Sequence, residues 1–226
     1  MGRPREHDEQ TRETLLVVAG KILDTDGAQQ LTVRRLAEDA GVSTRAVYSL
    51  FGGMPGVLAE LFRIGAEDMA ARHEAVPQQD DAAQEILPLA LAYRAGALAH
   101  PDSFQLSYGR TGLRFEAADE VVAILWRCYD RVLDAVERAL DQRGLADRDP
   151  QQTTLGLWGT VHGHASLELL GSLGPPPAAE AVWRATITSL VAALFPGPPG
   201  PVSPPVRRPA PSRRPPASGP RARPAG

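Results

Sequence analysis

The chain has 226 residues, a formal net charge of −3 and one cysteine, and 43% of its residues are hydrophobic. A single cysteine excludes a disulfide framework and a cysteine-rich metal cluster, and no apolar run approaches the length of a membrane span. The length fits one compact helical domain plus a smaller one, and the charge excludes a general basic field as the source of nucleic-acid affinity.

The first predicted helix covers residues 9–25. Its apolar positions recur at helical spacing, at Leu15, Leu16, Ala19, Ile22 and Leu23, and Asp26-Gly27 ends it. The preceding arm, Gly2-Arg3-Pro4-Arg5, is positively charged. It either reaches toward a DNA backbone or minor groove or forms an untethered terminus, and the sequence leaves both interpretations open.

Residues 31–53 predict two short helices joined by a tight turn. Thr32 is placed to cap the first helix, which buries Val33, Leu36, Ala37 and Ala40. Gly41 supplies the left-handed turn residue, and Ser43 is placed to cap the second helix, which buries Ala46, Val47 and Leu50. The second helix then presents hydrogen-bonding side chains suited to a major groove, those of Thr44, Arg45, Tyr48 and Ser49. An ordinary helical hairpin is the competing interpretation.

Arg45 has two possible roles in a DNA complex. Its guanidinium can donate a bidentate pair of hydrogen bonds to guanine, or it can clamp a phosphate. Residues 1–53 carry seven basic and eight acidic side chains, a net charge of −1, so affinity has to come from positioned arginines and helix amino termini.

Six more helices are predicted between residues 55 and 195. The first, 55–75, leads out of the motif, and a second covers 82–99, where Pro88 causes a kink or marks a late start. A short helix holds Phe104, Leu106 and Tyr108, a loop follows at 110–114, and a long helix covers 116–143 and stops at Gly144.

The last two predicted helices cover 150–170 and 178–195. The first of them carries Gly156, Gly159 and Gly163 in its interior, and each costs about 1 kcal/mol relative to alanine. A ridge of such small residues allows another helix to approach closely, so we expect this face to pack tightly.

The motif resembles the amino-terminal domain of the tetracycline repressor (TetR) family. The resemblance covers residues 9–62 and lies in Leu31-Thr32, Leu36-Ala37, Ala40-Gly41-Val42-Ser43, Tyr48 and Phe51. It implies that Arg34, Thr44, Arg45 and Ala46 contact bases and that Tyr48 anchors a phosphate. The candidate DNA-binding residues are therefore Thr32, Arg34, Arg35, Ser43, Thr44, Arg45, Ala46, Tyr48 and Ser49. The chain departs from the family at Met54, where a phosphate-binding lysine is common, and at Leu50, where a polar residue is common.

A second resemblance concerns residues 82–195. Trp158-Gly-Thr-Val-His162-Gly163, Leu167-Glu168, Tyr93 and Ala99-His100-Pro101 look like the WHG-type carboxy-terminal domain of a branch of these regulators. It implies an all-α fold of about nine helices and a homodimer formed through the last two. The predicted domains are a helix-turn-helix domain at 1–53, an effector-binding and dimerisation domain at 54–195, and a disordered proline- and arginine-rich tail at 196–226.

Aromatic side chains fall in the segments that surround the ligand cavity in this family, and they form either a pocket or plain core. The candidate pocket residues are Tyr93, Phe104, Tyr108, Phe115, Trp126, Tyr129, Trp158 and His162. His162, His164 and Glu168 suggest a metal site, but histidines two apart on a helix point to different sides, so we expect no metal and no cofactor. No nucleophile motif or phosphate-binding glycine loop indicates an enzyme.

The sequence therefore predicts a homodimeric transcriptional regulator, and a repressor rather than an activator. Its partners would be double-stranded DNA with a two-fold symmetric operator and an unidentified small-molecule effector, with no membrane. The charged start of the chain lacks the apolar core of a signal peptide, so the expected location is the cytoplasm. The alternatives are a helical ligand-binding dimer without operator affinity and a helical enzyme.

Overall fold

The computed structural model describes residues 5–107 and 119–198, and within these ranges it is helical throughout, without strands. This confirms the predicted all-α fold of about nine helices. The α-helices are α1 Arg5–Asp26, α2 Val33–Asp39, α3 Thr44–Phe51, α4 Met54–Glu74, α5 Ile86–Ala99, α6 Pro101–Ser107, α7 Asp119–Gln142, α8 Pro150–Leu169 and α9 Pro176–Leu194. Two 3₁₀ helices, η1 and η2, cover Ala28–Gln30 and Ala82–Glu85. No helix in the described part is long and apolar enough to cross a bilayer.

Several predicted features fall outside the described residues. They are the first part of the amino-terminal arm, Tyr108, the loop at 110–114, Phe115 and residues 199–226 of the predicted tail. Within the described residues, most helix boundaries lie within two residues of the prediction, but the starts of two helices differ by more. The first helix begins at Arg5 instead of residue 9, and Pro88 marks a late start, because η2 precedes α5 and places the proline in the first turn of α5.

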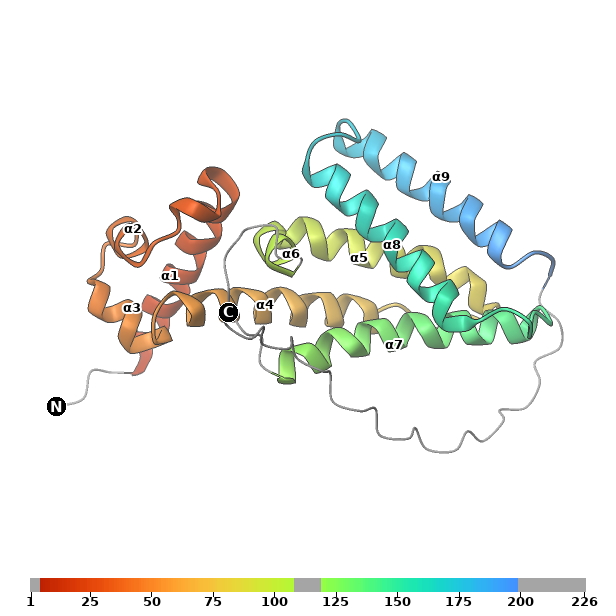
Figure 1. Cartoon of the computed structure of the whole chain (residues 1–226), viewed down its shortest axis with the longest axis horizontal. Helices are drawn as coiled ribbons and strands as arrows, with labels where there is room; N and C mark the ends of the chain where they lie inside the picture. The colour runs from red at the N-terminus through yellow and green to blue at the C-terminus, as the bar shows by residue number, and fades with distance from the viewer. Residues whose placement is uncertain (1–4, 108–118, 199–226) are drawn as a thin grey trace, which may run out of the picture.

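Helices α1, α2 and α3 form a small unit at one end of the molecule, with the start of α4 packed against it (Figure 1). The predicted apolar stripe of α1 is buried together with Leu36 and Ala37 of α2 and Val47 of α3. This core leaves one side of α3 exposed, because an eight-residue helix has room for only one buried face.

The turn between α2 and α3 has the hydrogen bonds of a Schellman motif. Gly41 has a φ of 66°, its N–H donates to the Glu38 carbonyl at 3.1 Å, and the Val42 N–H donates to the Ala37 carbonyl at 2.9 Å. The Thr32 side chain caps α2 by accepting from the Arg35 N–H at 3.2 Å. Ser43 occupies the capping position of α3, but its side chain makes no capping bond, so no N-cap side chain pairs with the first N–H groups of α3.

Helix α4 connects the small unit to a larger bundle, in which it lies beside α7 and below α5 (Figure 1). The bundle has its own core, built on residues from η2, α5, α7, α8 and α9, and Trp183 of α9 is completely buried in it. The indole N–H of Trp183 donates to Glu168 at 2.8 Å, and Arg94 of α5 binds the same carboxylate at 2.7 Å. These bonds join α5, α8 and α9.

The glycine ridge of α8 is open within the subunit. A Cβ built at Gly156, Gly159 or Gly163 meets nothing within 4 Å. The expected tight packing is therefore not made by any described helix of the same chain, because α8 turns its other side toward α5 and α7. Leu167 and Leu170 continue this open face toward the end of the helix and are 45% and 64% exposed.

A buried ion cluster holds the far end of the bundle together. Glu85 is completely buried, and its carboxylate lies 2.8 Å from Arg131 and 2.8 Å from Arg138, both on α7. The backbone N–H of Gln79 donates to the same carboxylate at 2.8 Å. Burial alone would raise the pKa of Glu85, but the hydrogen bonds from Arg138, Gln79 and Arg131 outweigh it and lower the pKa below its ordinary value of 4.5.

We predict that Glu85→Gln lowers the free energy of unfolding by about 3 kcal/mol at pH 7, because it leaves two arginines without their carboxylate. The loss should be complete above about pH 4.5, where the unfolded chain ionises this group, and should shrink as the pH falls through the lower folded-state pKa. Urea unfolding at several pH values measures it. The control is Glu67→Gln, a half-exposed partner of Arg63, which should cost less than about 1 kcal/mol.

Candidate DNA-binding face and ligand cavity

The exposed side of α3 carries the side chains that the sequence assigns to DNA. Thr44, Arg45, Tyr48 and Ser49 are exposed, whereas Val47 is completely buried. Ala46 and Leu50 are half-buried, in line with their predicted inward positions. The helix therefore presents hydroxyl, guanidinium and phenol groups together on one free surface.

The arginines near this face differ in how freely they can move. Arg34 and Arg45 are exposed, and among the described residues neither forms an ion pair. Arg35 instead binds Asp39 at 2.6 Å and Asp26 at 3.1 Å, which raises the pKa of its guanidinium. Arg34 and Arg45 are thus available to a ligand, while Arg35 has to leave two carboxylates first.

Arg12 of α1 fixes the end of α3 to the start of α4. Its guanidinium donates to the Leu50 carbonyl at 3.0 Å, lies 3.1 Å from Glu60 of α4, and sits 4.6 Å from the centre of the Phe51 ring. A cation over an aromatic ring adds to the two polar contacts. This single side chain therefore sets the orientation of α3 relative to the connecting helix.

The two departures from the TetR pattern have a structural counterpart. Leu50 and Met54 are half-buried and pack against the core of the small unit, so neither offers a polar group to a phosphate. Beside them, Gly53 is buried with a φ of 119°, and a Cβ there would lie 3.3 Å from the Tyr48 ring. Gly53 thus supports the exposed Tyr48 ring from behind.

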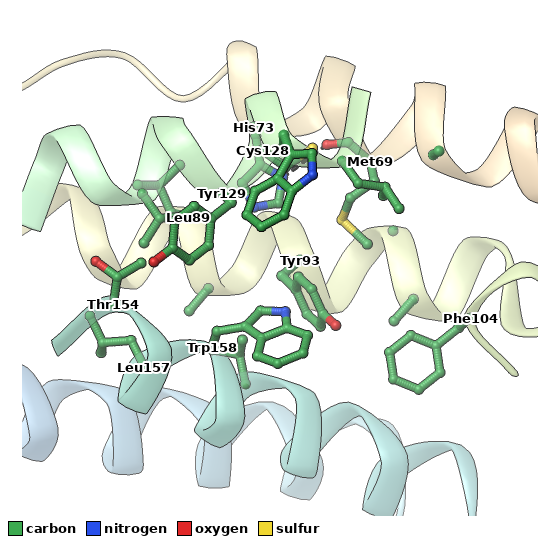
Figure 2. A pocket seen from close by; sticks show the side chains of 18 of the residues that line it. Met69, His73, Leu89, Tyr93, Phe104, Cys128, Tyr129, Thr154, Leu157 and Trp158 are labelled. Carbon is green, nitrogen blue, oxygen red and sulfur yellow. Dashed lines mark hydrogen bonds between the residues drawn. The ribbon is translucent and has the colours of Figure 1, made fainter. Parts of the chain in front are cut away.

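The larger bundle encloses a cavity of about 560 Å³. Its walls come from α4, α5, α6, α7, α8 and α9, and Figure 2 shows labelled side chains from five of these helices around it. Met69 and His73 of α4 lie on one side and Leu157 and Trp158 of α8 on the other. The partly exposed Trp126, at 47%, and Trp158, at 41%, place the mouth of the cavity between α7 and α8.

The structure brings together most of the predicted pocket residues that it describes. Those that line the cavity are Tyr93, Phe104, Trp126, Tyr129 and Trp158. His162 is not among the lining residues, because its ring stacks on Phe104 and Trp158 and its Nδ1 lies 3.1 Å from the Tyr93 hydroxyl. It holds the aromatic wall in place from behind.

Sequence reasoning missed several residues of the lining. Met69, His73, Cys128 and Thr154 all face the cavity. Their helical spacing matches that of core residues, so periodicity could not distinguish the two environments. Burial raises the pKa of the Cys128 thiol to about 11, so this group stays protonated at neutral pH.

Helix α6 contacts the small unit, the connecting helix and the cavity through three successive residues. A Cβ on Gly20 of α1 would lie 3.0 Å from the carboxylate of Asp102. The Ser103 hydroxyl donates to the Phe62 carbonyl of α4 at 3.4 Å, and Phe104 lines the cavity. One short helix therefore contacts α1, α4 and the cavity through neighbouring side chains.

The residues considered for a metal have other partners. Glu168 accepts hydrogen bonds from Arg94 and Trp183, and the Nδ1 of His164 donates to the Thr160 carbonyl at 2.9 Å. No group of three or more metal-binding side chains occurs within the described ranges.

Part of the chain matches a known family of protein domains. The tetracyclin repressor-like C-terminal domain matches residues 86–190, inside the region that the second resemblance covers. This segment runs from the start of α5 into α9 and does not include the motif between α2 and α3. Residues 86–190 thus form a C-terminal domain of the TetR type.

Solved structures show how far the TetR fold extends along the chain. A protein of unknown function from Rhodococcus sp. RHA1 is 29% identical, with a TM-score of 0.66 over 82% of this chain and 95% of that one. The protein SCO4313 is 28% identical, with a TM-score of 0.64 over 83% and 98%. The TetR-family transcriptional regulator PfmR from Thermus thermophilus is 19% identical, with a TM-score of 0.67 over 78% and 96%, and shows the fold alone. No curated protein matches the sequence.

We predict that Gly53→Ala destabilises the protein by about 1 to 3 kcal/mol, because alanine is strained at this backbone conformation. It should also displace the Tyr48 ring, which a change in tyrosine NMR signals would report. Gly52→Asn is the control: Gly52 has a φ of 71° with open space around its Cβ, and asparagine tolerates this conformation. Equal costs for the two variants would exclude a specific role for the contact with Tyr48.

Proposed function

We propose that the chain is a homodimeric, sequence-specific DNA-binding transcriptional regulator, and a repressor that a small-molecule effector releases from its operator. The observation that carries this proposal is the connection of an exposed polar helix face to a ligand-sized cavity through one continuous helix. The match of residues 86–190 to a tetracyclin repressor-like C-terminal domain supports it and does not favour an enzyme. The domain division at residues 53 and 195 and the cytoplasmic location belong to the same proposal.

The DNA-binding face is proposed to enter the major groove with α3. Arg45 and Arg34 would contact base edges, because both side chains are exposed and neither forms an ion pair among the described residues. Tyr48, which is also exposed, would contact a phosphate. Thr32, Ser43, Thr44, Ala46 and Ser49 would complete the interface, with Arg35 in a supporting position. The N–H groups at the start of α3 would add a phosphate contact.

The effector is proposed to act on the distance between the two reading helices of the dimer. These helices have to be about 34 to 36 Å apart to enter successive major grooves. A ligand that moves Phe104 shifts α6, and α6 contacts α1 through Asp102 and α4 through Ser103. DNA and effector would then compete through one two-state equilibrium.

The dimer is proposed to form through α8 and α9. The open face of α8 carries Gly156, Gly159, Gly163, Leu167 and Leu170 at spacings of three and four residues. On α9, exposed small residues follow the same spacing at Ala181, Ala185, Thr188 and Ala192. Two helices that expose small residues in this way can pack closely against the same pair in a second copy, forming a four-helix interface.

Selection of bound sequences from a random DNA pool tests the regulator proposal. We expect a two-fold symmetric site for the wild-type chain. Arg45→Ala should weaken binding to that site by about 1 to 3 kcal/mol and relax the preference at one base pair in each half-site. The control is Arg127→Ala, which removes the same charge from an exposed position on α7, away from α3 and from the proposed dimer helices, and should leave affinity unchanged.

The alternative outcomes are separable. Uniformly weaker binding of Arg45→Ala with the same base preference would assign Arg45 to a phosphate. Weak, salt-sensitive and unselective binding by the wild-type chain would favour a ligand-binding dimer without operator affinity, an outcome for which the apolar Leu50 and Met54 are the structural argument.

We predict that Gly159→Leu converts the dimer to a monomer while each subunit stays folded. A Cβ at this position meets nothing within the subunit, but a leucine side chain would separate the two copies. Sedimentation velocity measures the mass, and circular dichroism the helix content. Ala71→Leu, at an exposed position of α4, adds a leucine outside the proposed interface and should remain dimeric. A dimeric Gly159→Leu would place the interface elsewhere.

A further inference from the structure

The cavity contains buried polar side chains whose protons are already used within the chain. The Thr154 hydroxyl donates to the Pro150 carbonyl at 2.8 Å, and the Ser103 hydroxyl donates to the Phe62 carbonyl at 3.4 Å. His73 is 3% exposed, and its Nδ1 lies 2.9 Å from the Met69 carbonyl. A carbonyl oxygen only accepts hydrogen bonds, so Nδ1 carries the proton of the ring.

The bond to Met69 determines what His73 offers to a ligand. Burial, with a contribution from the positive charge of Arg131, lowers the pKa of His73 despite the bond to Met69, so the ring is neutral at pH 7. In a neutral imidazole protonated at Nδ1, Nε2 is an acceptor. Within the described part of the chain, no group bonds Nε2, and this far edge of the ring is the one turned away from the backbone of α4.

The remainder of the lining excludes ions and favours ring-shaped apolar molecules. It is dominated by methyl, methylene and aromatic groups, including those of Leu89, Tyr129 and Trp158 (Figure 2). The charged Arg131 nearby does not line the cavity: its Nη2 pairs with Glu85, and its Nη1 is buried without a hydrogen-bond partner among the described residues. His100, which does line the cavity, lies 3.4 Å from the carboxylate of Asp68. An ion placed among such groups loses its hydration without gaining partners, which costs several kcal/mol.

We propose that the cavity selects an uncharged, ring-bearing apolar molecule that donates a hydroxyl or N–H hydrogen bond to Nε2 of His73. Thr154, on the opposite wall, offers a second acceptor, because its own proton is bound to Pro150. The cavity volume of about 560 Å³ fits a drug-sized ligand of this kind. This inference rests on the proposed function, in which the cavity holds the effector.

Displacement of a fluorescent probe tests the proposal on the full-length chain. The probe is N-phenyl-1-naphthylamine, a neutral apolar fluorophore, and the competitors are 2-naphthol, its methyl ether 2-methoxynaphthalene, and the anion 8-anilinonaphthalene-1-sulfonate. We expect 2-naphthol to bind about fivefold more tightly than the ether, the ratio for one net hydrogen bond. The sulfonate, which has the probe's own skeleton with one added charge, should bind at least tenfold more weakly than the probe.

Two variants assign the hydrogen bond to its acceptor. His73→Phe should bring the ratio between 2-naphthol and the ether close to one and leave the affinity of the ether unchanged, which also shows that the cavity is intact. Thr154→Val, an isosteric change, should reduce the ratio less. Thr160→Val is the control, because Thr160 bonds its own helix at Gly156 and does not line the cavity.

A fivefold ratio that survives in His73→Phe would overturn the assignment to His73. Two results with the wild-type chain would overturn the proposed ligand class: equal binding of 2-naphthol and 2-methoxynaphthalene, or tight binding of 8-anilinonaphthalene-1-sulfonate. Neither measurement requires His73→Phe to fold. The assay contains no DNA. A negative result in the displacement assay would therefore not contradict a positive operator selection. A negative operator selection would likewise not contradict the proposed ligand class.

Discussion

The continuity of α4 is the constraint on which the rest of the structure depends. Its 21 residues form one unbroken helix, about 32 Å long at 1.5 Å per residue. One end packs against α3 and is fixed there by Arg12, and the other end carries Met69 and His73 into the cavity wall. One continuous helix therefore contacts both the DNA-binding face and the cavity.

Helix α6 gives α4 a second point of attachment. A Cβ at Gly65 of α4 would collide with the Ser103 hydroxyl, so α6 approaches α4 as closely as a glycine allows. Asp102, the preceding residue, faces Gly20 of α1. The pKa of the nearby Asp24 is raised by the burial of Asp24 itself and by the negative charge of Asp102. The contact between the two units therefore combines tight packing with repulsion between the carboxylates of Asp102 and Asp24.

The sequence predicted the small unit well, because its signals are local. The Thr32 cap, the left-handed Gly41 and the stripe of α1 each follow from a few neighbouring residues, and the structure confirms them. The cavity was predictable only in part. Periodicity identifies inward residues but does not reveal whether atoms or empty space lie opposite them, so Met69 and His73 could not be told from core residues. The position of His162 behind the wall likewise depends on Tyr93, 69 residues away.

The open glycine ridge of α8 also links assembly to the folding of each subunit. Three interior glycines cost α8 about 3 kcal/mol relative to alanine, and within the described chain no neighbour packs on them in return. An isolated subunit therefore has a weakened α8, which frays more readily and is an easier substrate for proteases. Association with a second copy would reverse this, so the lifetime of the chain in a cell would rise with its own concentration.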